Sequence, residues 1–210
     1  MRLRILKNNL KLSKFQKEIL VGLLLGDGCL ERTKNSTGAR LKVSQCLRQQ
    51  ELVWWLYQNF SSLVATLPKI YRNELRFNTL THSCFKYFYD IFYPQGKKVV
   101  PDNIQGLLTP TAFAVWFMGD GSVKSRECRG RILNTQSFKR PDIERLIFLL
   151  KEKFNLISSI RKQKDGLQIY ISAKSAEILN ELLKDKILPY FNYKLPNQKF
   201  AITSLSKTSI

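Results

Sequence analysis

The chain has 210 residues, of which 35 are Lys or Arg and 16 are Asp or Glu, so its formal charge is 35 − 16 = +19. This excess indicates a polyanionic partner such as nucleic acid, while 44% hydrophobic residues exclude a disordered basic tail. No apolar run reaches the roughly 18 residues of a membrane span, so no membrane partner is expected, and a single His excludes nucleases that need paired histidines.

The first half of the chain is predicted to open with a capped helix. Ser13 and Gln16 have the spacing of a capping box, and the apolar residues that follow at helical spacing end in Gly-Asp-Gly at 26–28. Two-residue alternation predicts strands near 40–44 and 75–80, and helical spacing returns at 51–60 and 83–92.

The second half repeats this order. Thr109 can cap a helix whose first position is Pro110 and which ends in Gly-Asp-Gly at 119–121. Strands are predicted near 129–136 and 167–172, and helices at 141–154 and 175–183. We therefore predict an α+β fold of two pseudo-symmetric α-β-β-α-β-β-α repeats, residues 1–106 and 107–210, whose antiparallel sheets form a saddle over DNA.

A nine-residue pattern occurs twice, at 20–28 and 113–121, and each copy places an Asp at the end of an apolar helix. The negative end of the helix dipole disfavours a carboxylate there, so Asp27 and Asp120 together call for a compensating cation. A single Asp after a Leu-rich helix is usually a solvated turn residue. Two at matched positions indicate two half-sites, with a divalent metal between the helix ends.

Lysines are spaced alike after the two Asp residues. Lys98 follows Asp27 by 98 − 27 = 71 residues, and Lys194 follows Asp120 by 194 − 120 = 74. Each lysine stands shortly before a proline. The matched spacing indicates a duplicated chain that carries one Asp-Lys pair in each half.

Both nine-residue patterns resemble the motif of the LAGLIDADG homing endonucleases, in their single-chain, two-motif form. The resemblance extends to residues 12–18, 133–138 and 193–197. It implies a monomeric enzyme that uses Mg²⁺, with Mn²⁺ as a substitute, to cut both strands of a long double-stranded DNA target. It also implies intron homing and an organellar location, mitochondrion or chloroplast, which the Lys- and Asn-rich composition favours.

The resemblance also implies particular site residues. The motif Asp binds metal with the backbone carbonyl before it, a lysine activates water or stabilises phosphate charge, and a polar strand residue orients water. The implied metal ligands are Asp27, Asp120 and the carbonyls of Gly26 and Gly119. The implied catalytic residues are Asp27, Asp120, Lys98, Lys194, Gln45 and Gln136.

Long polar side chains at every second strand position, and in the loops between strands, are suited to base edges and phosphates. The expected strand contacts are Arg40, Lys42, Arg76, Asn78, Arg131, Gln168 and Tyr170. The expected loop contacts are Arg32, Lys34, Arg72, Lys124, Arg126, Lys162 and Lys164. Because many phosphates would be contacted, binding should weaken steeply with salt.

Two other functions stay open for such a sequence. An RNA maturase that assists splicing of intron RNA could use the same scaffold and the same basic charge. A DNA-binding protein that has lost catalysis is a further alternative, although retention of both Asp27 and Asp120 favours cleavage. A restriction-type site is unsupported, because none of the 16 Asp and Glu is followed by Lys two residues later.

Overall fold

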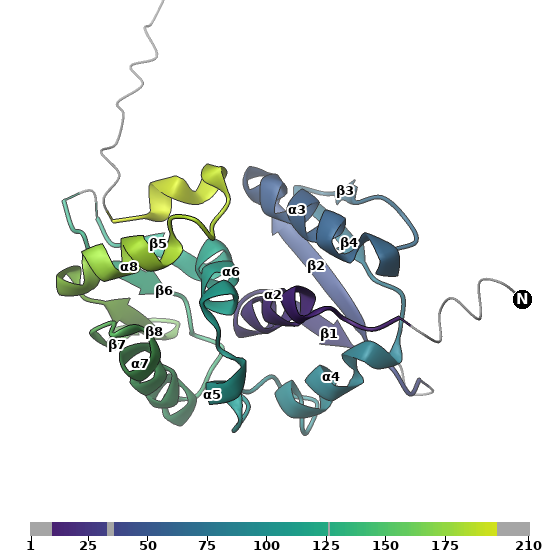
Figure 1. Ribbon diagram of the computed structural model, residues 1–210, viewed down its shortest axis with the longest axis horizontal. Coiled ribbons are helices and arrows are strands. Elements are labelled where there is room, and N and C mark those ends of the chain that lie inside the picture. The colour runs from purple at the N-terminus through teal and green to yellow at the C-terminus, as the bar shows by residue number, and fades with distance from the viewer. Residues whose placement is uncertain (1–9, 33–35, 126, 197–210) are drawn as a thin grey trace, which may run out of the picture.

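Two four-stranded antiparallel sheets, each covered by helices on one side, make up the protein in a computed structural model that describes residues 10–32, 36–125 and 127–196 (Figure 1). The strand order is β1-β2-β4-β3 in the first sheet and β5-β6-β8-β7 in the second. The predicted α-β-β-α-β-β-α order is confirmed in both halves. No helix in the described part of the chain is long and apolar enough to cross a membrane.

The elements of each half follow one another in the same sequence. The first half contains α2 (Lys14–Leu25), β1 (Cys29–Glu31), β2 (Arg40–Cys46), α3 (Gln50–Phe60), β3 (Lys69–Tyr71), β4 (Glu74–Asn78) and α4 (Lys86–Phe92). A short helix, α5 (Ile104–Leu107), then leads to the second half. That half contains α6 (Pro110–Asp120), β5 (Gly121–Val123), β6 (Arg131–Leu133), α7 (Arg140–Phe154), β7 (Ser158–Gln163), β8 (Gly166–Ile171), α8 (Ala176–Leu183) and the 3₁₀ helix η5 (Pro189–Lys194).

The two motif helices, α2 and α6, begin at the predicted caps. The Ser13 side chain accepts from the Gln16 amide while Gln16 Oε1 accepts from the Ser13 amide, which completes the capping box. Thr109 Oγ1 accepts from the Ala112 amide at 3.2 Å, and Pro110 occupies the first turn. These caps fix where each helix starts, and therefore where its motif Asp falls.

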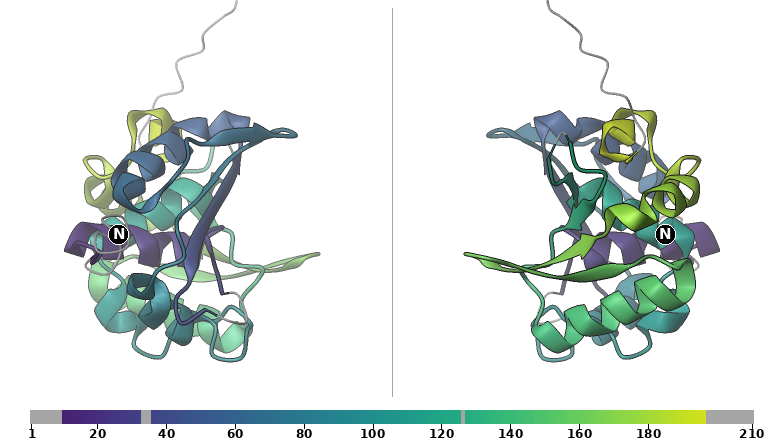
Figure 2. Two further views of the ribbon diagram at one scale, coloured as in Figure 1. Left: turned by 90° about the vertical axis from the view of Figure 1, so that its right-hand side faces the viewer. Right: turned by 90° about the vertical axis from the view of Figure 1, so that its left-hand side faces the viewer.

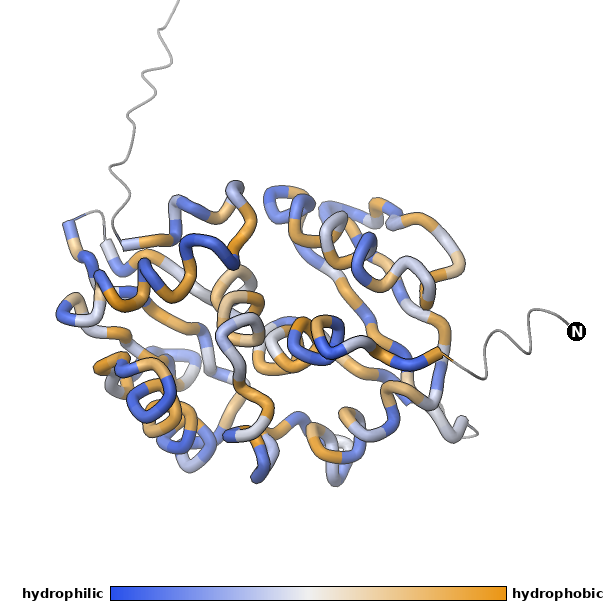
Figure 3. Tube along the Cα trace, in the orientation of Figure 1, coloured by the Kyte–Doolittle hydropathy of each residue, from blue (hydrophilic) through white to orange (hydrophobic). Residues whose placement is uncertain are grey.

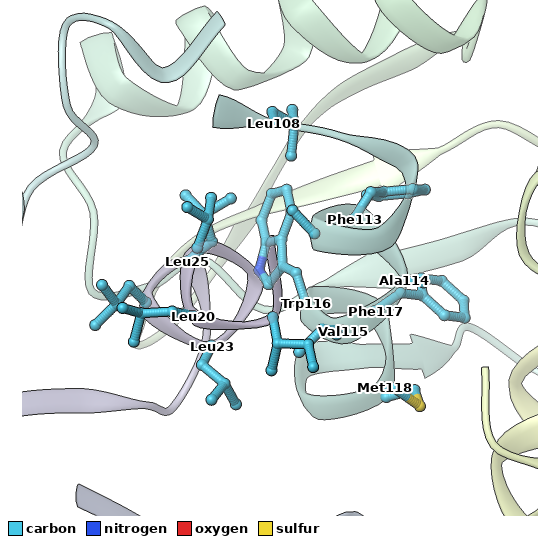
Figure 4. Packing of buried hydrophobic residues seen from close by; sticks show 14 of the residues in the cluster. Leu20, Leu23, Leu25, Leu108, Phe113, Ala114, Val115, Trp116, Phe117 and Met118 are labelled. Atoms are coloured by element: carbon cyan, nitrogen blue, oxygen red, sulfur yellow. The ribbon is translucent and has the colours of Figure 1, made fainter. Parts of the chain in front are cut away.

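Helices α2 and α6 pack against each other at the centre of the molecule, where apolar residues concentrate (Figures 1 and 3). A methyl group added at Gly22 would lie 2.3 Å from the Ala112 carbonyl oxygen and 2.7 Å from Val115 Cβ, so only glycine fits there. Trp116 and Val115 of α6 point toward α2 in Figure 4, and Trp116 is fully buried. Close approach of the two backbones brings the C-terminal ends of the helices together.

Side chains on each sheet alternate between the helix-covered face and the opposite face, here called the outer face. In β2, Leu41 and Val43 are buried in the core while Arg40 and Lys42 lie on the outer face. The β3–β4 and β7–β8 hairpins project from the same side of the molecule and diverge from each other (Figure 2). This arrangement matches the predicted saddle.

The strand register aligns the two halves residue by residue. The residue two places after each motif Asp pairs with Lys42 in the first sheet and with Ile132 in the second, so Lys42 and Ile132 are equivalent. The other equivalent pairs used below are Leu41 with Arg131, Ser44 with Asn134, Gln45 with Thr135, and Arg76 with Gln168.

Candidate active site

The two motif Asp residues stand side by side but in different surroundings. Helix α2 stops at Leu25, which leaves Asp27 exposed in the turn that follows, whereas α6 continues through Asp120, whose side chain is buried with 9% exposed. A methyl group added at Gly26 would lie 2.1 Å from Asp120 Oδ2, so the carboxylate of the second motif rests against the backbone of the first. The pair is adjacent and asymmetric.

The buried carboxylate of Asp120 is electrostatically strained. Burial raises the pKa of Asp120 to about 7, and the negative charge of Asp27 adds to this effect, while Lys98 and Lys194 oppose it. Asp120 Oδ2 is buried and has no hydrogen-bond partner among the described residues. An uncompensated carboxylate oxygen of this kind is what a bound cation would satisfy.

Each predicted lysine reaches the end of a motif helix. Lys98 Nζ donates to the carbonyl of Gly26 and, at 2.9 Å, to that of Gly28. Lys194 Nζ donates to the carbonyls of Met118 at 2.6 Å and Gly119 at 3.3 Å. An ammonium group at a helix C-terminus favourably opposes the negative end of the dipole. The helix ends are thus compensated by lysines, and the carbonyls proposed as metal ligands already accept one hydrogen bond each.

Burial disfavours the charged form of both lysines. Burial lowers the pKa of Lys98, and it lowers the pKa of Lys194 to about 8, although Asp120 and Asp27 work in the opposite direction. Lys194 is only 4% exposed. The loss of hydration outweighs the nearby carboxylates, so Lys194 can change its protonation near neutral pH.

The two predicted glutamines do not occupy equivalent positions. Gln45 Nε2 donates to Asp27 Oδ2 at 3.4 Å, which brings Gln45 into the first half-site. Gln136 Nε2 donates instead to Asp165 at the β7–β8 turn, and the residue equivalent to Gln45 is Thr135, whose hydroxyl donates to the Leu167 carbonyl. Gln136 is therefore not the structural equivalent of Gln45, and the catalytic role that the resemblance implied for Gln136 is not supported by its position.

Arg131 is not a DNA contact in this structure, contrary to the prediction. The register places it on the core face, where it is 2% exposed. Its guanidinium donates to the carbonyls of Lys194 at 2.5 Å, Leu195 at 2.7 Å, Gly130 at 2.9 Å and Cys128 at 3.1 Å. Arg131 therefore holds the segment that carries Lys194 against the second sheet.

The outer face of the first sheet carries the cations that the alternation predicted. The cations Arg40, Lys42 and Arg76 lie on it by register, together with the neutral Asn78. Glu31 shares this face and accepts from Arg40 at 2.8 Å and from Lys42 at 3.0 Å; these hydrogen bonds lower the pKa of the Glu31 carboxyl. Two of the cations are thus held in place by an acidic neighbour.

On the second sheet, the outer face differs from the prediction. Gln168 and Tyr170 lie on it as predicted, but Gln168 is buried. Lys162, expected in a loop, lies in β7 and pairs with Leu167, which turns it to the face opposite Gln168. Arg161, which the sequence analysis did not select, pairs with Gln168 and shares the outer face. The alternation along β7 is the signal that could have identified it.

The loop candidates are spread over several turns. Arg32 is paired with Asp90 at 3.6 Å, Arg72 is exposed in the β3–β4 turn with φ of +54°, Lys124 lies 4.9 Å from the centre of the Tyr170 ring, and Lys164 is exposed beyond β7. Lys34 and Arg126 lie outside the described residues.

The residues at the ends of α2 and α6 provide some of the ligands that the expected divalent metal would need. Two adjacent carboxylates, one of them with an unpartnered buried oxygen, fit a hard cation that prefers oxygen ligands. In the described part of the chain no three Asp, Glu, His or Cys side chains gather at one place. A metal here would therefore take its remaining ligands from carbonyls, water or substrate.

Comparison with known proteins agrees with this arrangement. Residues 17–179 match the LAGLIDADG DNA endonuclease family. Cytochrome b mRNA maturase bI2 of Debaryomyces hansenii is 30% identical over 90% of this chain and 76% of its own length, and the probable intron-encoded endonuclease 1 of Wickerhamomyces canadensis is 31% identical over 88% and 85%. The structure of the homing endonuclease I-WcaI bound to its DNA recognition sequence superposes with a TM-score of 0.86, at 28% identity over 92% of this chain and 91% of that one. The chain belongs to the LAGLIDADG DNA endonuclease family.

Proposed function

We propose that this protein is a site-specific homing endonuclease that hydrolyses both strands of a long double-stranded DNA target and so promotes intron mobility. The observation that carries the proposal is the meeting of two Asp-Lys pairs at the ends of α2 and α6, between two antiparallel sheets. One relative described as a probable intron-encoded endonuclease and another described as a DNA endonuclease support it. Each half would act on one DNA strand.

In the proposed reaction, Asp27 and Asp120 hold a divalent cation, Mg²⁺ or in its place Mn²⁺. When bound, the cation supplies activation of water and neutralisation of charge on the phosphate. Lys98 and Lys194 place positive charge at each helix end, where it can stabilise the anionic transition state. Gln45 orients the Asp27 carboxylate by its hydrogen bond.

The outer faces of the two sheets are the proposed DNA interface. On the first sheet, Arg40, Lys42, Arg76 and Asn78 present donors that suit guanine or adenine edges and phosphates. On the second sheet, Arg161 and Tyr170 take this role. The loop residues Arg32, Arg72, Lys124 and Lys164 are proposed as phosphate contacts.

We further propose that residues 1–106 and 107–210 are the two repeats, that the protein acts as a monomer and that it works in an organelle. Both halves of the site come from one chain, so a second copy is not needed to complete it. The proposal of an organellar location rests on the relatives described as cytochrome b mRNA maturases and on the Lys- and Asn-rich composition of the chain.

An RNA maturase is the second candidate function. Two relatives, at 30% and 32% identity, are described as cytochrome b mRNA maturases, although the chain spans only 47% of the one from Saccharomyces cerevisiae. The positive charge of the surface formed by the two sheets would attract RNA as well as DNA, so charge does not distinguish the two partners.

The test is to incubate the protein with a plasmid library of intron-insertion junctions in Mg²⁺, with Ca²⁺ as the binding-only control. Linear product from one junction, in Mg²⁺ but not in Ca²⁺, supports the endonuclease. Tight binding of intron RNA with no cutting of any junction in Mg²⁺ or Mn²⁺ would contradict it and favour the maturase.

A further inference from the structure

A chain of side-chain hydrogen bonds crosses the second sheet and ends at Asp120. Arg161 Nη1 on β7 donates to Gln168 Oε1 on β8 at 3.2 Å, and Gln168 Nε2 donates to Asn134 Oδ1 at 2.7 Å. Asn134 Nδ2 then donates to the Asp120 backbone carbonyl at 3.0 Å, and the Asn134 backbone amide donates to the same carbonyl at 3.1 Å. The chain links a cation on the outer face to a motif Asp.

The middle member of this chain cannot move independently of its neighbours. Gln168 is 8% exposed, and both ends of its side-chain amide are used, one toward Arg161 and one toward Asn134. A buried amide that loses either partner is left with an unsatisfied polar atom, which is unfavourable in a site that water does not reach. Reorientation of Arg161 therefore biases Gln168, and through it Asn134.

The first half of the protein has different contacts at the equivalent positions. Ser44, the equivalent of Asn134, donates its hydroxyl to Glu74 at 2.6 Å. Arg76, the equivalent of Gln168, lies over the Tyr71 ring at 3.8 Å. A polar chain of the same composition is thus specific to the second half, whereas the motif Asp is common to both.

We infer that Asn134 and Gln168 are positioning residues that couple DNA contact at Arg161 to the placement of Asp120, so that one strand is cut only when the correct base or phosphate engages Arg161. The inference rests on the proposed endonuclease function. Arg161 is the part-exposed end of the chain, and its guanidinium, whose Nε and Nη2 lie beside the Gln163 side-chain amide, is the charged group that DNA would meet. The backbone at Asp120 is the other end, and its position sets where the carboxylate lies.

Strand-resolved cutting of a supercoiled plasmid, labelled on each strand, tests this in three variants: Asn134→Ala, Arg161→Ala and, as matched control, Ser44→Ala. Asn134→Ala should slow one strand by about 10- to 100-fold, the effect of a small misplacement, and leave the other strand within a few-fold, so that nicked circles accumulate. Ser44→Ala should give no strand bias. Equal slowing of both strands by Asn134→Ala would overturn the inference, and so would no slowing of either.

A double variant separates coupling from simple damage. If the chain transmits the signal, Arg161→Ala and Asn134→Ala together should slow the affected strand no more than the stronger single change. Multiplying effects would show two independent roles and contradict the inference. Arg161→Lys, which keeps a donor for Gln168, should restore part of the rate.

Hydrogen exchange on the protein bound to DNA in Ca²⁺ gives a result that does not depend on cutting. The backbone amide of Asn134, which donates to the Asp120 backbone carbonyl, should exchange more slowly when target DNA binds, and Arg161→Ala should abolish that slowing. Equal protection in parent and variant would overturn the inference. A parent that binds DNA and gains protection but cuts neither strand would instead refute the proposed endonuclease function alone.

Discussion

Removing the Asp120 carboxylate should make the protein more stable while it destroys the proposed site. The pKa of Asp120 rises from the ordinary 3.8 to about 7, chiefly because the carboxylate is buried. At about 1.4 kcal/mol for each pKa unit, ionised Asp120 destabilises the folded state by roughly 4 kcal/mol at pH 8. An Asn at this position leaves one amide atom without a partner, at about 1 kcal/mol, so Asp120→Asn should gain about 3 kcal/mol.

The sign of the pH dependence follows from the direction of this change. Because burial raises the pKa of Asp120 in the folded state, the folded protein holds this proton more tightly than the unfolded chain does. The stability that the bound proton contributes is fully present below the ordinary pKa of Asp and is lost as pH rises through about 7. The advantage of Asp120→Asn over the parent should therefore be largest at pH 8 and narrow by roughly 3 kcal/mol at pH 5. Asp27→Asn, at an exposed carboxylate, should change stability by less than about 1 kcal/mol.

Urea unfolding of parent, Asp120→Asn and Asp27→Asn, in chelator at pH 5 and pH 8, measures these differences. For a chain of this length, the gain at pH 8 corresponds to a rise in Tm of about 6–12 °C. An Asp120→Asn variant no more stable than the parent at pH 8, or an advantage that does not change with pH, would refute the raised pKa of this buried carboxylate.

Three further predictions concern Arg131, the packing of the motif helices and Lys194. Arg131→Met should destabilise the fold by about 3–5 kcal/mol, because four carbonyls lose a buried cation, and urea unfolding measures this loss. It should leave the salt dependence of DNA binding unchanged, whereas Arg40→Ala should reduce the slope of log affinity against log salt by about 1, as binding titrations at several salt concentrations would show. Gly22→Ala should cost about 1–3 kcal/mol through its clash with Ala112, while Gly119→Ala, where an added methyl group meets nothing within 4 Å, should not destabilise; thermal unfolding compares the two. Single-turnover cutting should fall as pH rises through about 8, because Lys194 then loses its charge, and Lys194→Arg should move this decline to higher pH.

Much of the fold and half of the site could be predicted because they depend on local patterns. The capping box at Ser13, the Thr109 cap and the alternation in β2 each fix a helix start or a strand face within a few residues. Asp27, Asp120, Lys98 and Lys194 were found because duplication places them at matched intervals along the chain. The structure brings these four side chains to the same pair of helix ends.

The differences come mainly from strand bounds and strand register. A shift of one residue moves a side chain to the other face of a sheet, which is why Arg131 lies in the core. Lys162, expected in a loop, lies in β7 on the face opposite Arg161, and Gln136, beyond the end of β6, donates to Asp165 in the β7–β8 turn. Distances along the chain cannot fix register to one residue. The unequal burial of Asp27 and Asp120 was also beyond the sequence, because it depends on α6 extending through its Asp while α2 ends before it.

The most direct test of the central claim is to measure cutting and binding of the same target by the parent, Asp27→Asn and Asp120→Asn. We expect double-strand cutting by the parent in Mg²⁺, loss of that cutting in either variant, and retained binding of the target by both variants in Ca²⁺. Full double-strand cutting by a variant that lacks one of the two carboxylates would contradict a site built from both motif ends.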